Sequence, residues 1–174
     1  MSDIQQIQQK IEAIYRSSEE SKVKVPQALQ VMQWISFAED YIAAASIIDG
    51  QAPQHWLPRL QMTGQAVESA LKACLVSADA ELPNHHDLVQ LYESASKHGL
   101  TLSDPDLAAI VHLGHFYFQD VATGTRYKTR YPTDQTERLG GAVPYNSAFV
   151  SIVRSLIEQA TERNQANISG PVPR

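Results

Sequence analysis

Two pairs of histidines are the side chains of this sequence best suited to acid–base chemistry. His85 and His86 are adjacent, and His112 and His115 are three positions apart. The unperturbed pKa of an imidazole is close to neutrality, so a histidine can take up or release a proton under ordinary conditions. If the protein is an enzyme, these four histidines are the candidate catalytic residues, with Arg130 as a candidate for stabilising negative charge on a phosphate.

The adjacent histidines have a structural interpretation as well as a functional one. They precede Asp87 and Leu88 at the expected start of a helix, where backbone N–H groups favour an anion. A histidine in such a turn can instead form a hydrogen bond with nearby backbone, and Asn84 is a competent N-cap for the helix. We favour the structural interpretation, in which the imidazole of His86 bonds locally.

His112 and His115 are spaced so that they lie close together on one side of a helix. Such a pair can share a metal ion, but a zinc site normally needs a third protein ligand, and the spacing of the acidic residues identifies none. The single cysteine, Cys74, lies on an apolar helical stripe and indicates a small buried side chain. We therefore expect no metal site and no cofactor, and we expect these two histidines to line an interface or a pocket.

A short basic segment is the best candidate for binding a ligand. Its cations and aromatic rings are Arg126, Tyr127, Lys128, Arg130 and Tyr131. Mixed cations and rings bind the phosphates and bases of nucleotides and single-stranded nucleic acid. Alternatively, the segment is a solvated loop whose arginines pair with carboxylates on neighbouring helices. Both interpretations remain open at this point.

The composition is that of an ordinary soluble domain. The chain has 174 residues, of which 43% are hydrophobic and 19% are charged, so one domain is expected. Its net charge of −5 argues against nonspecific binding of nucleic acid over the whole surface. No apolar run is long enough to span a membrane, and the N-terminus does not resemble a signal peptide. These features predict a cytoplasmic protein that does not enter a membrane.

Apolar residues recur at spacings of three and four along most of the chain, which predicts helices rather than strands. The expected helices cover approximately residues 4–14, 26–50, 59–78, 87–98, 104–121 and 146–163. Ser103 or Asp104 can cap the fifth of these, and Gly99 can end the fourth in a left-handed turn. Residues 123–145 form a long loop, a kind of segment that is usually functional or mobile. The sequence thus predicts an all-α bundle.

Three segments follow from this pattern. Residues 1–24 contain an N-terminal amphipathic helix, with a narrow seam of isoleucines at positions 4, 7, 11 and 14, followed by a linker. Residues 25–163 form the helical bundle, and residues 164–174 are expected to be a flexible tail. A narrow apolar seam suits docking on a single partner helix. The sequence does not say whether the seam docks within one chain or across a dimer.

Three motifs follow one another along the chain in a recognisable order, and the first lies in the third predicted helix. Glu68 and Lys72 form a favourable pair four positions apart, which we place on the outer face of the helix. The order is this helix, then His86-Asp87-Leu88, then Arg130-Tyr131-Pro132. It resembles the HEPN family, the higher eukaryotes and prokaryotes nucleotide-binding domain, over residues 34–162. The resemblance implies an up-and-down helical bundle, here with an extra N-terminal helix.

The resemblance also raises the question of ribonuclease activity. HEPN ribonucleases carry an arginine followed, after four to six residues, by a histidine, and no arginine of this chain has a histidine at that spacing. We therefore expect a non-catalytic, homodimeric module that recognises a nucleotide, RNA or a protein partner such as a nucleotidyltransferase. A toxin–antitoxin or defence setting is what the resemblance implies. The alternative is a divergent, metal-independent ribonuclease that combines one of the four histidines with Arg126 or Arg130.

Overall fold

The structure is a computed structural model that describes residues 25–52, 55–117, 119–121, 124–126 and 146–169. This part of the chain is built mainly of helices, which confirms the all-α prediction. The elements are α2 (Gln27–Gln51), α3 (Trp56–Ser77), α4 (Leu88–Ser96), α5 (Asp104–Tyr117), β1 (Gln119–Val121), β2 (Gly124–Arg126) and α7 (Asn146–Ser169). The isoleucine seam of residues 4–14 and the stretch 127–145 lie outside the described residues.

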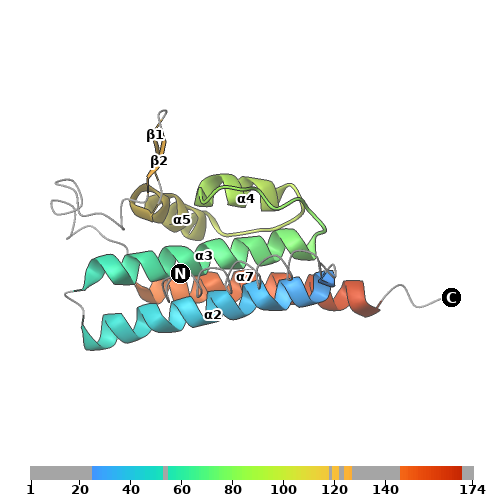
Figure 1. The fold of residues 1–174 in the computed structure, drawn as a ribbon, viewed down its shortest axis with the longest axis horizontal. Helices are drawn as coiled ribbons and strands as arrows, with labels where there is room; N and C mark the ends of the chain where they lie inside the picture. The colour runs from blue at the N-terminus through green and yellow to red at the C-terminus, as the bar shows by residue number, and fades with distance from the viewer. Residues whose placement is uncertain (1–24, 53–54, 118, 122–123, 127–145, 170–174) are drawn as a thin grey trace, which may run out of the picture.

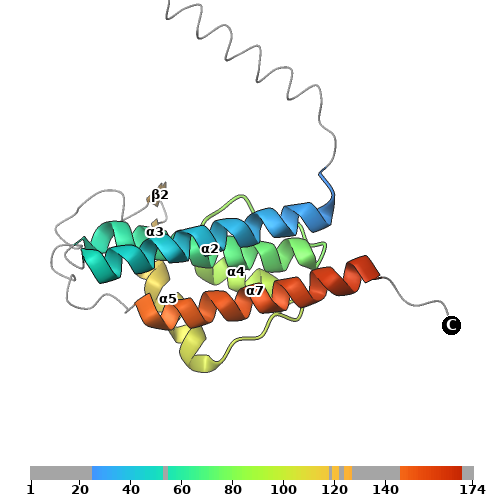
Figure 2. The same ribbon diagram turned by 90° about the horizontal axis from the view of Figure 1, so that it is seen from below.

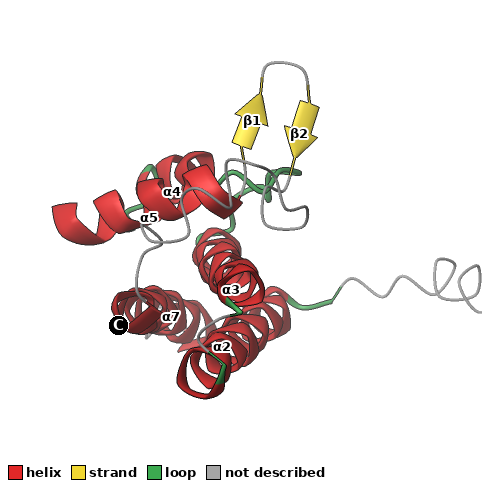
Figure 3. Cartoon of the chain, turned by 90° about the vertical axis from the view of Figure 1, so that its left-hand side faces the viewer, coloured by secondary structure: helices red, strands yellow, loops and turns green. Residues whose placement is uncertain are grey.

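The helices form two layers with α3 at the centre. The long helices α2, α3 and α7 lie side by side, and the shorter α4 and α5 cover the opposite side of α3 (Figures 1 and 3). Figure 2 shows α2 and α7 running together along the length of the bundle. Of the described helices, α3 contacts all four others. None of the described helices is long and apolar enough to cross a membrane.

The apolar stripe predicted for α3 is confirmed, and its neighbours bury more of the helix than the stripe alone. All side chains from Ala66 to Ser77 are buried. They include Glu68 and Lys72, so their predicted place on an outer face is wrong. The reason is that α4 and α5 cover the side of α3 that faces away from α2 and α7. Periodicity within one helix cannot reveal how many neighbours surround it.

The start of α4 differs from the prediction in its capping residue. Asp87 is the N-cap, and its carboxylate accepts hydrogen bonds from the backbone N–H groups of Val89 and Gln90, at 2.9 and 3.1 Å. Asn84 is therefore not the cap of this helix. An aspartate cap provides hydrogen-bond acceptors for N–H groups that have no partner within the helix. Its negative charge is also stabilised by the positive end of the helix dipole.

The turn between α4 and α5 follows the prediction. Gly99 has φ 87°, in the left-handed region that glycine adopts without strain. Ser103 precedes α5, and its Oγ accepts a hydrogen bond from the backbone N–H of Asp106 at 3.3 Å. It also donates to the Asp106 carboxylate at 2.7 Å. Ser103 therefore caps the start of α5 through its hydroxyl.

The end of α5 was predicted wrongly. The helix ends at Tyr117 rather than near Val121, and β1 and β2 follow as a short antiparallel hairpin. Gln119 pairs with Arg126 in this hairpin, and Val121 pairs with Gly124. The apolar residues after Tyr117 continue the helical spacing, which is why the sequence predicted a longer helix.

The C-terminal helix is also longer than predicted. It continues to Ser169, so residues 164–169, which we assigned to a flexible tail, are helical. The amide of Asn167 donates to the carbonyl of Ser77 at 2.8 Å, and the amide of Asn164 donates to the carbonyl of Ala28 at 3.5 Å. These bonds connect the last turns of α7 with the end of α3 and the start of α2.

Candidate functional site

The most unusual feature of the interior is the carboxylate of Glu68, whose side chain is only 5% exposed. Its Oε1 lies 2.7 Å from Nζ of Lys72 and 2.8 Å from Nδ1 of His86. Its Oε2 accepts a hydrogen bond from the hydroxyl of Tyr117 at 2.6 Å. We call these four residues the Glu68 cluster. A buried carboxylate is tolerable only with such partners, since desolvating an unpaired charge is very costly.

Lys72 is held on two sides. It lies one turn after Glu68 on α3, the spacing at which side chains of a helix meet. Its Nζ is also 5.0 Å from the centre of the Trp34 ring on α2, within the range of a cation–π interaction. The predicted pairing of Lys72 with Glu68 is confirmed, but in the interior. The lysine thereby connects α2 to the Glu68 cluster.

His86 contacts a residue that is distant in sequence. The connection from α3 to α4 brings its ring back to Glu68, eighteen positions earlier. The sequence did not predict the contact between Nδ1 of His86 and Glu68. Nδ1 of His85 accepts a local bond from the N–H of Asp87 at 3.3 Å. An ionised carboxylate only accepts hydrogen bonds, so Nδ1 of His86 carries a proton when Glu68 is ionised.

The Glu68 cluster joins three parts of the chain. Glu68 and Lys72 come from α3, His86 from the connection before α4, and Tyr117 from the last residue of α5. The ring of Tyr117 packs so closely on α3 that a Cβ at Gly64 would lie 2.1 Å from its Cδ2. The side chain of His86 is 39% exposed, so the cluster reaches solvent at this residue.

The basic segment begins near Tyr117, the member of the Glu68 cluster that comes from α5. Arg126 is the last residue of β2 and pairs with Gln119, two positions after Tyr117. Figure 1 shows the hairpin projecting from the end of α5. Tyr127, Lys128, Arg130 and Tyr131 lie outside the described residues. The hydrogen bond from Tyr117 to Glu68 therefore anchors the root of the hairpin from which the basic segment departs.

A comparison with known protein families identifies the family of this chain. The HEPN domain model matches residues 31–162, which include every described helix in whole or in part. The chain belongs to the HEPN family. No curated protein and no solved structure is significantly similar to it. The family predicted from the helix, the histidine turn and the basic segment is thus confirmed.

The second histidine pair of this HEPN domain faces solvent. His112 and His115 are exposed on α5, and with Asp104, Leu107 and Val111 they line a shallow open pocket of about 410 Å³. The ring of His112 also packs edge-on against Phe116, with centroids 5.2 Å apart. The prediction that these histidines line a pocket is confirmed. In the part of the chain that the structure describes, no three His, Cys, Asp or Glu residues are placed to hold a metal ion.

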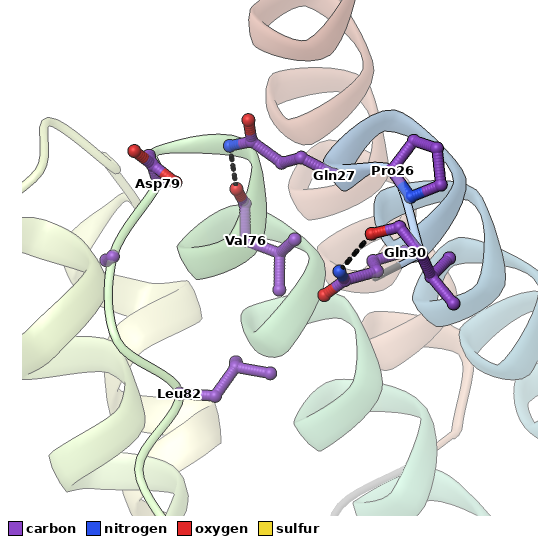
Figure 4. A pocket seen from close by; sticks show the side chains of 8 residues that line it. Pro26, Gln27, Gln30, Val76, Asp79 and Leu82 are labelled. Atoms are coloured by element: carbon purple, nitrogen blue, oxygen red, sulfur yellow. Dashed lines mark hydrogen bonds between the residues drawn. The ribbon is translucent and has the colours of Figure 1, made fainter. Parts of the chain in front are cut away.

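The HEPN domain has a further pocket of about 450 Å³ where the start of α2 meets the end of α3 (Figure 4). The amides of Gln27 and Gln30 donate to the carbonyls of Val76 and Val25, at 2.6 and 2.7 Å. Asp79 lies on its rim and has φ 55°, a left-handed conformation uncommon for residues other than glycine. The aspartate follows the end of α3, where such a turn closes a helix, so its conformation has a structural explanation.

The cysteine on α3 is confirmed as a buried side chain. Its Sγ donates a hydrogen bond to the carbonyl of Leu156 on α7, at 3.3 Å. Burial raises the pKa of the Cys74 thiol to about 12, although Arg163 and a backbone hydrogen bond partly oppose this effect. A thiol with so high a pKa is not a nucleophile at neutral pH. Cys74 therefore plays no part in the candidate site.

The sequence did not identify Tyr117 or Trp34 as members of the site. Each occupies an ordinary apolar position in a helix, and nothing in its spacing distinguishes it from other core residues. One signal was available for Tyr117. Gly64 lies four positions before Glu68 in α3, and glycine inside a helix often marks a close approach by another element. That element is the ring of Tyr117.

Proposed function

We propose that this chain is a cytoplasmic, non-catalytic HEPN domain that binds the phosphate groups of a nucleotide or of RNA through its basic segment. The observation that carries the proposal is the position of Arg126 at the end of a hairpin whose root, Tyr117, is hydrogen-bonded to buried Glu68. Such an anchor fixes the point at which the basic segment leaves the bundle.

The chemistry of the basic segment favours a phosphate-bearing ligand. Arg126, Lys128 and Arg130 place three cations within five residues of a chain whose net charge is −5. Tyr127 and Tyr131 add rings on which a base can stack. A hydrogen bond between a cation and a phosphate contributes roughly 1.5–3 kcal/mol when it is shielded from water.

The absence of the family's ribonuclease motif supports a non-catalytic function. The chain lacks the arginine–histidine spacing of HEPN ribonucleases. His86 also belongs to a network that connects helices, because its Nδ1 is bound to a carboxylate that Lys72 and Tyr117 share. We therefore expect no cleavage of generic single-stranded RNA or of tRNA by the purified protein.

A divergent ribonuclease is the second candidate, and one observation favours it. His86 is partly exposed and bound to a carboxylate, an arrangement that orients an imidazole for proton transfer. RNA cleavage that persists through stringent purification and disappears in His86→Ala or His112→Ala would establish this alternative and overturn the non-catalytic function.

Binding is tested by titrating a panel of nucleotides and a short single-stranded RNA into wild type and into Arg130→Ala. We expect Arg130→Ala to weaken binding by about tenfold or more, because it removes a cation that would contact the phosphate. Melting should be almost unchanged, because the proposal gives Arg130 no role in packing. Affinity should also fall as salt is added. Arg154→Ala is the matched control, because Arg154 is an exposed arginine on α7.

The opposite result would show that the segment is only a scaffold. In that case Arg130→Ala lowers the melting temperature by several degrees, and wild type binds none of the nucleotides and no RNA. A wild type that instead binds a protein partner, such as a nucleotidyltransferase of a toxin–antitoxin or defence system, would favour the protein-binding form of the module.

The proposal includes a homodimer, as the resemblance to dimeric family members implies. The pocket on α5 offers a surface for such a contact, because Val111 is exposed there beside Leu107 and the two histidines. Light scattering at micromolar concentration should give the mass of two chains. A monomer mass under those conditions would contradict the dimer.

A further inference from the structure

Helix α2 exposes an unusual amount of apolar surface. Seven large hydrophobic residues of the described chain are exposed, and five of them lie on α2 or directly before it. They are Val25, Leu29, Met32, Phe37 and Ile47, with exposed fractions between 41% and 59%. Isolated apolar residues are common on protein surfaces, but a series along one helix indicates a surface that is covered in use.

These residues belong mainly to one side of the helix. At 3.6 residues per turn, Leu29, Met32 and Ile47 lie within about 60° of one another around the axis. Phe37 lies at the margin of this side, about 80° from Leu29 and about 140° from Met32. The buried Ala38 lies on the opposite side, where α2 packs on α3 and α7. Figure 3 shows α2 at the edge of the bundle, with both of these helices on its inner side. We call the outward side the α2 apolar face.

We propose that residues 4–14 of the same chain dock as a helix on the α2 apolar face. Their isoleucines at positions 4, 7, 11 and 14 form a narrow seam, flanked mostly by glutamines. A seam at alternating spacings of three and four packs against one helix and leaves the rest of its own helix in water. The α2 apolar face is likewise the side of a single helix, on which Leu29, Met32 and Ile47 offer apolar contacts among exposed polar residues.

The position of the seam along the chain favours docking within one chain. Residues 15–24 connect it to Val25, and ten residues can span up to about 33 Å when extended. The α2 apolar face from Leu29 to Ile47 is about 27 Å long, since a helix rises 1.5 Å per residue. The seam can therefore fold back beside the first half of α2. A tether this short gives an effective concentration in the millimolar range, above that of a second chain at micromolar concentration.

Cysteine crosslinking in the full chain tests this docking. Ile11→Cys is combined in turn with Leu29→Cys, Met32→Cys and Phe37→Cys, and each double variant is treated with a short bismaleimide. The native Cys74 is only 3% exposed and should not react. We expect at least one pair to give a crosslink within a single chain, recognised by an intact mass of one chain plus one linker.

The matched control moves only the cysteine on the seam. Gln9→Cys places the thiol on the opposite side of the same helix and is combined with the same three positions. Its crosslinking yield should be at least about fivefold lower, because helical residues two apart point to different sides. Crosslinked dimers as the main product, equal yields from Ile11 and Gln9, or no crosslink from any of the three pairs would each overturn the proposal.

A second measurement does not depend on which residues of the seam lie opposite which residues of α2. In the full chain, the α2 face is labelled at Met32→Cys with a small maleimide, with and without Ile7→Asp and Ile11→Asp. The two aspartates should speed labelling by about tenfold or more, because they remove the apolar burial that holds the seam in place. Gln6→Asp with Gln9→Asp is the charge-matched control and should leave the rate unchanged. An unchanged rate in the isoleucine variant would overturn the proposal, whatever the chain binds.

Discussion

Helices α3 and α2 are built in opposite ways. The centre of α3 buries two charged side chains, Glu68 and Lys72, whereas α2 exposes Leu29, Met32 and Phe37. The usual preference places apolar residues inside and charges outside. The difference lies in the position of each helix, because α3 is surrounded by the four other described helices and α2 lies at the edge. Position in the bundle, and not residue type alone, decides which side chains are buried.

The two helices also differ in whether neighbouring residues stabilise the buried charges of α3 and cover the exposed apolar side chains of α2. The charges on α3 have partners inside the protein, since His86, Tyr117 and the ring of Trp34 surround them. Among the described residues, no buried side-chain nitrogen or oxygen lacks a hydrogen-bond partner. The apolar face of α2 has no such compensation from a described element, and it therefore points to an additional partner, which we propose is the isoleucine seam.

The largest expected effect is the loss of the buried carboxylate on α3. Glu68→Gln removes the charge that balances Lys72, and breaking a buried ion pair typically costs about 3–5 kcal/mol. Urea unfolding should show this loss as a lower midpoint. Glu93→Gln, at an exposed position of α4, is the control and should change stability by no more than about 0.5 kcal/mol. Equal stabilities of the two variants would mean that the Glu68 cluster does not stabilise the fold.

Two glycines sharpen the comparison between crowded α3 and open α2. Gly64→Ala places a Cβ against the buried ring of Tyr117 and should cost about 1–3 kcal/mol, as overpacking does. A Cβ at Gly50 on α2 meets nothing within 4 Å, so Gly50→Ala should stabilise by about 0.5–1 kcal/mol. Thermal melts of both variants would detect these opposite signs. A neutral Gly64→Ala would show that α3 and α5 are not in close contact.

The thiol on α3 gives a prediction about pH. Burial raises the pKa of Cys74 from 9.0 to about 12, so the folded state keeps a proton that the unfolded state loses above pH 9. Its contribution to stability is therefore complete below about pH 9 and decreases as the pH rises toward 12. Between pH 9 and 10 the loss should be about 1 kcal/mol. Unfolding of wild type and Cys74→Ala across this range measures it, and parallel pH profiles would contradict it.

The smallest effect concerns the entry to α4, next to His86. Asp87→Ala removes the cap of this helix and should cost about 1 kcal/mol. Asn84→Ala should be nearly neutral, because Asn84 is exposed and is not the cap. Denaturant unfolding compares the two variants directly. If Asn84→Ala is the more destabilising, the capping assignment is wrong.

Local spacing was enough to predict most of the helices. It placed the stripe of α3, the cap at Ser103 and the left-handed Gly99, because each depends on residues within one or two turns. Spacing also led to two errors. It continued α5 beyond Tyr117, since apolar residues follow there, and it ended the last helix at residue 163, since the sequence after it is polar. The amides of Asn164 and Asn167 bond to other helices, which local spacing cannot reveal.

The candidate site was less predictable than the fold. The sequence identified His86 separately from the pair Glu68 and Lys72, but the bond between His86 and Glu68 depends on the path of the chain after α3. The role of Tyr117 depends on how α5 crosses α3 at Gly64. Contacts of this kind join residues 18 and 49 positions apart, and no periodic pattern connects them.

The most direct test of the Glu68 cluster is a double-mutant cycle between Glu68→Met, which leaves no oxygen to accept the bond, and Tyr117→Phe, measured by urea unfolding. Tyr117→Phe removes only the hydroxyl that donates to Glu68 Oε2 at 2.6 Å, and it leaves the ring in place. If this bond joins α5 and the root of the hairpin to α3, the two substitutions should be coupled by about 0.5–3 kcal/mol. Effects that simply add would show that the carboxylate and the hydroxyl do not interact, and that the cluster does not anchor the basic segment.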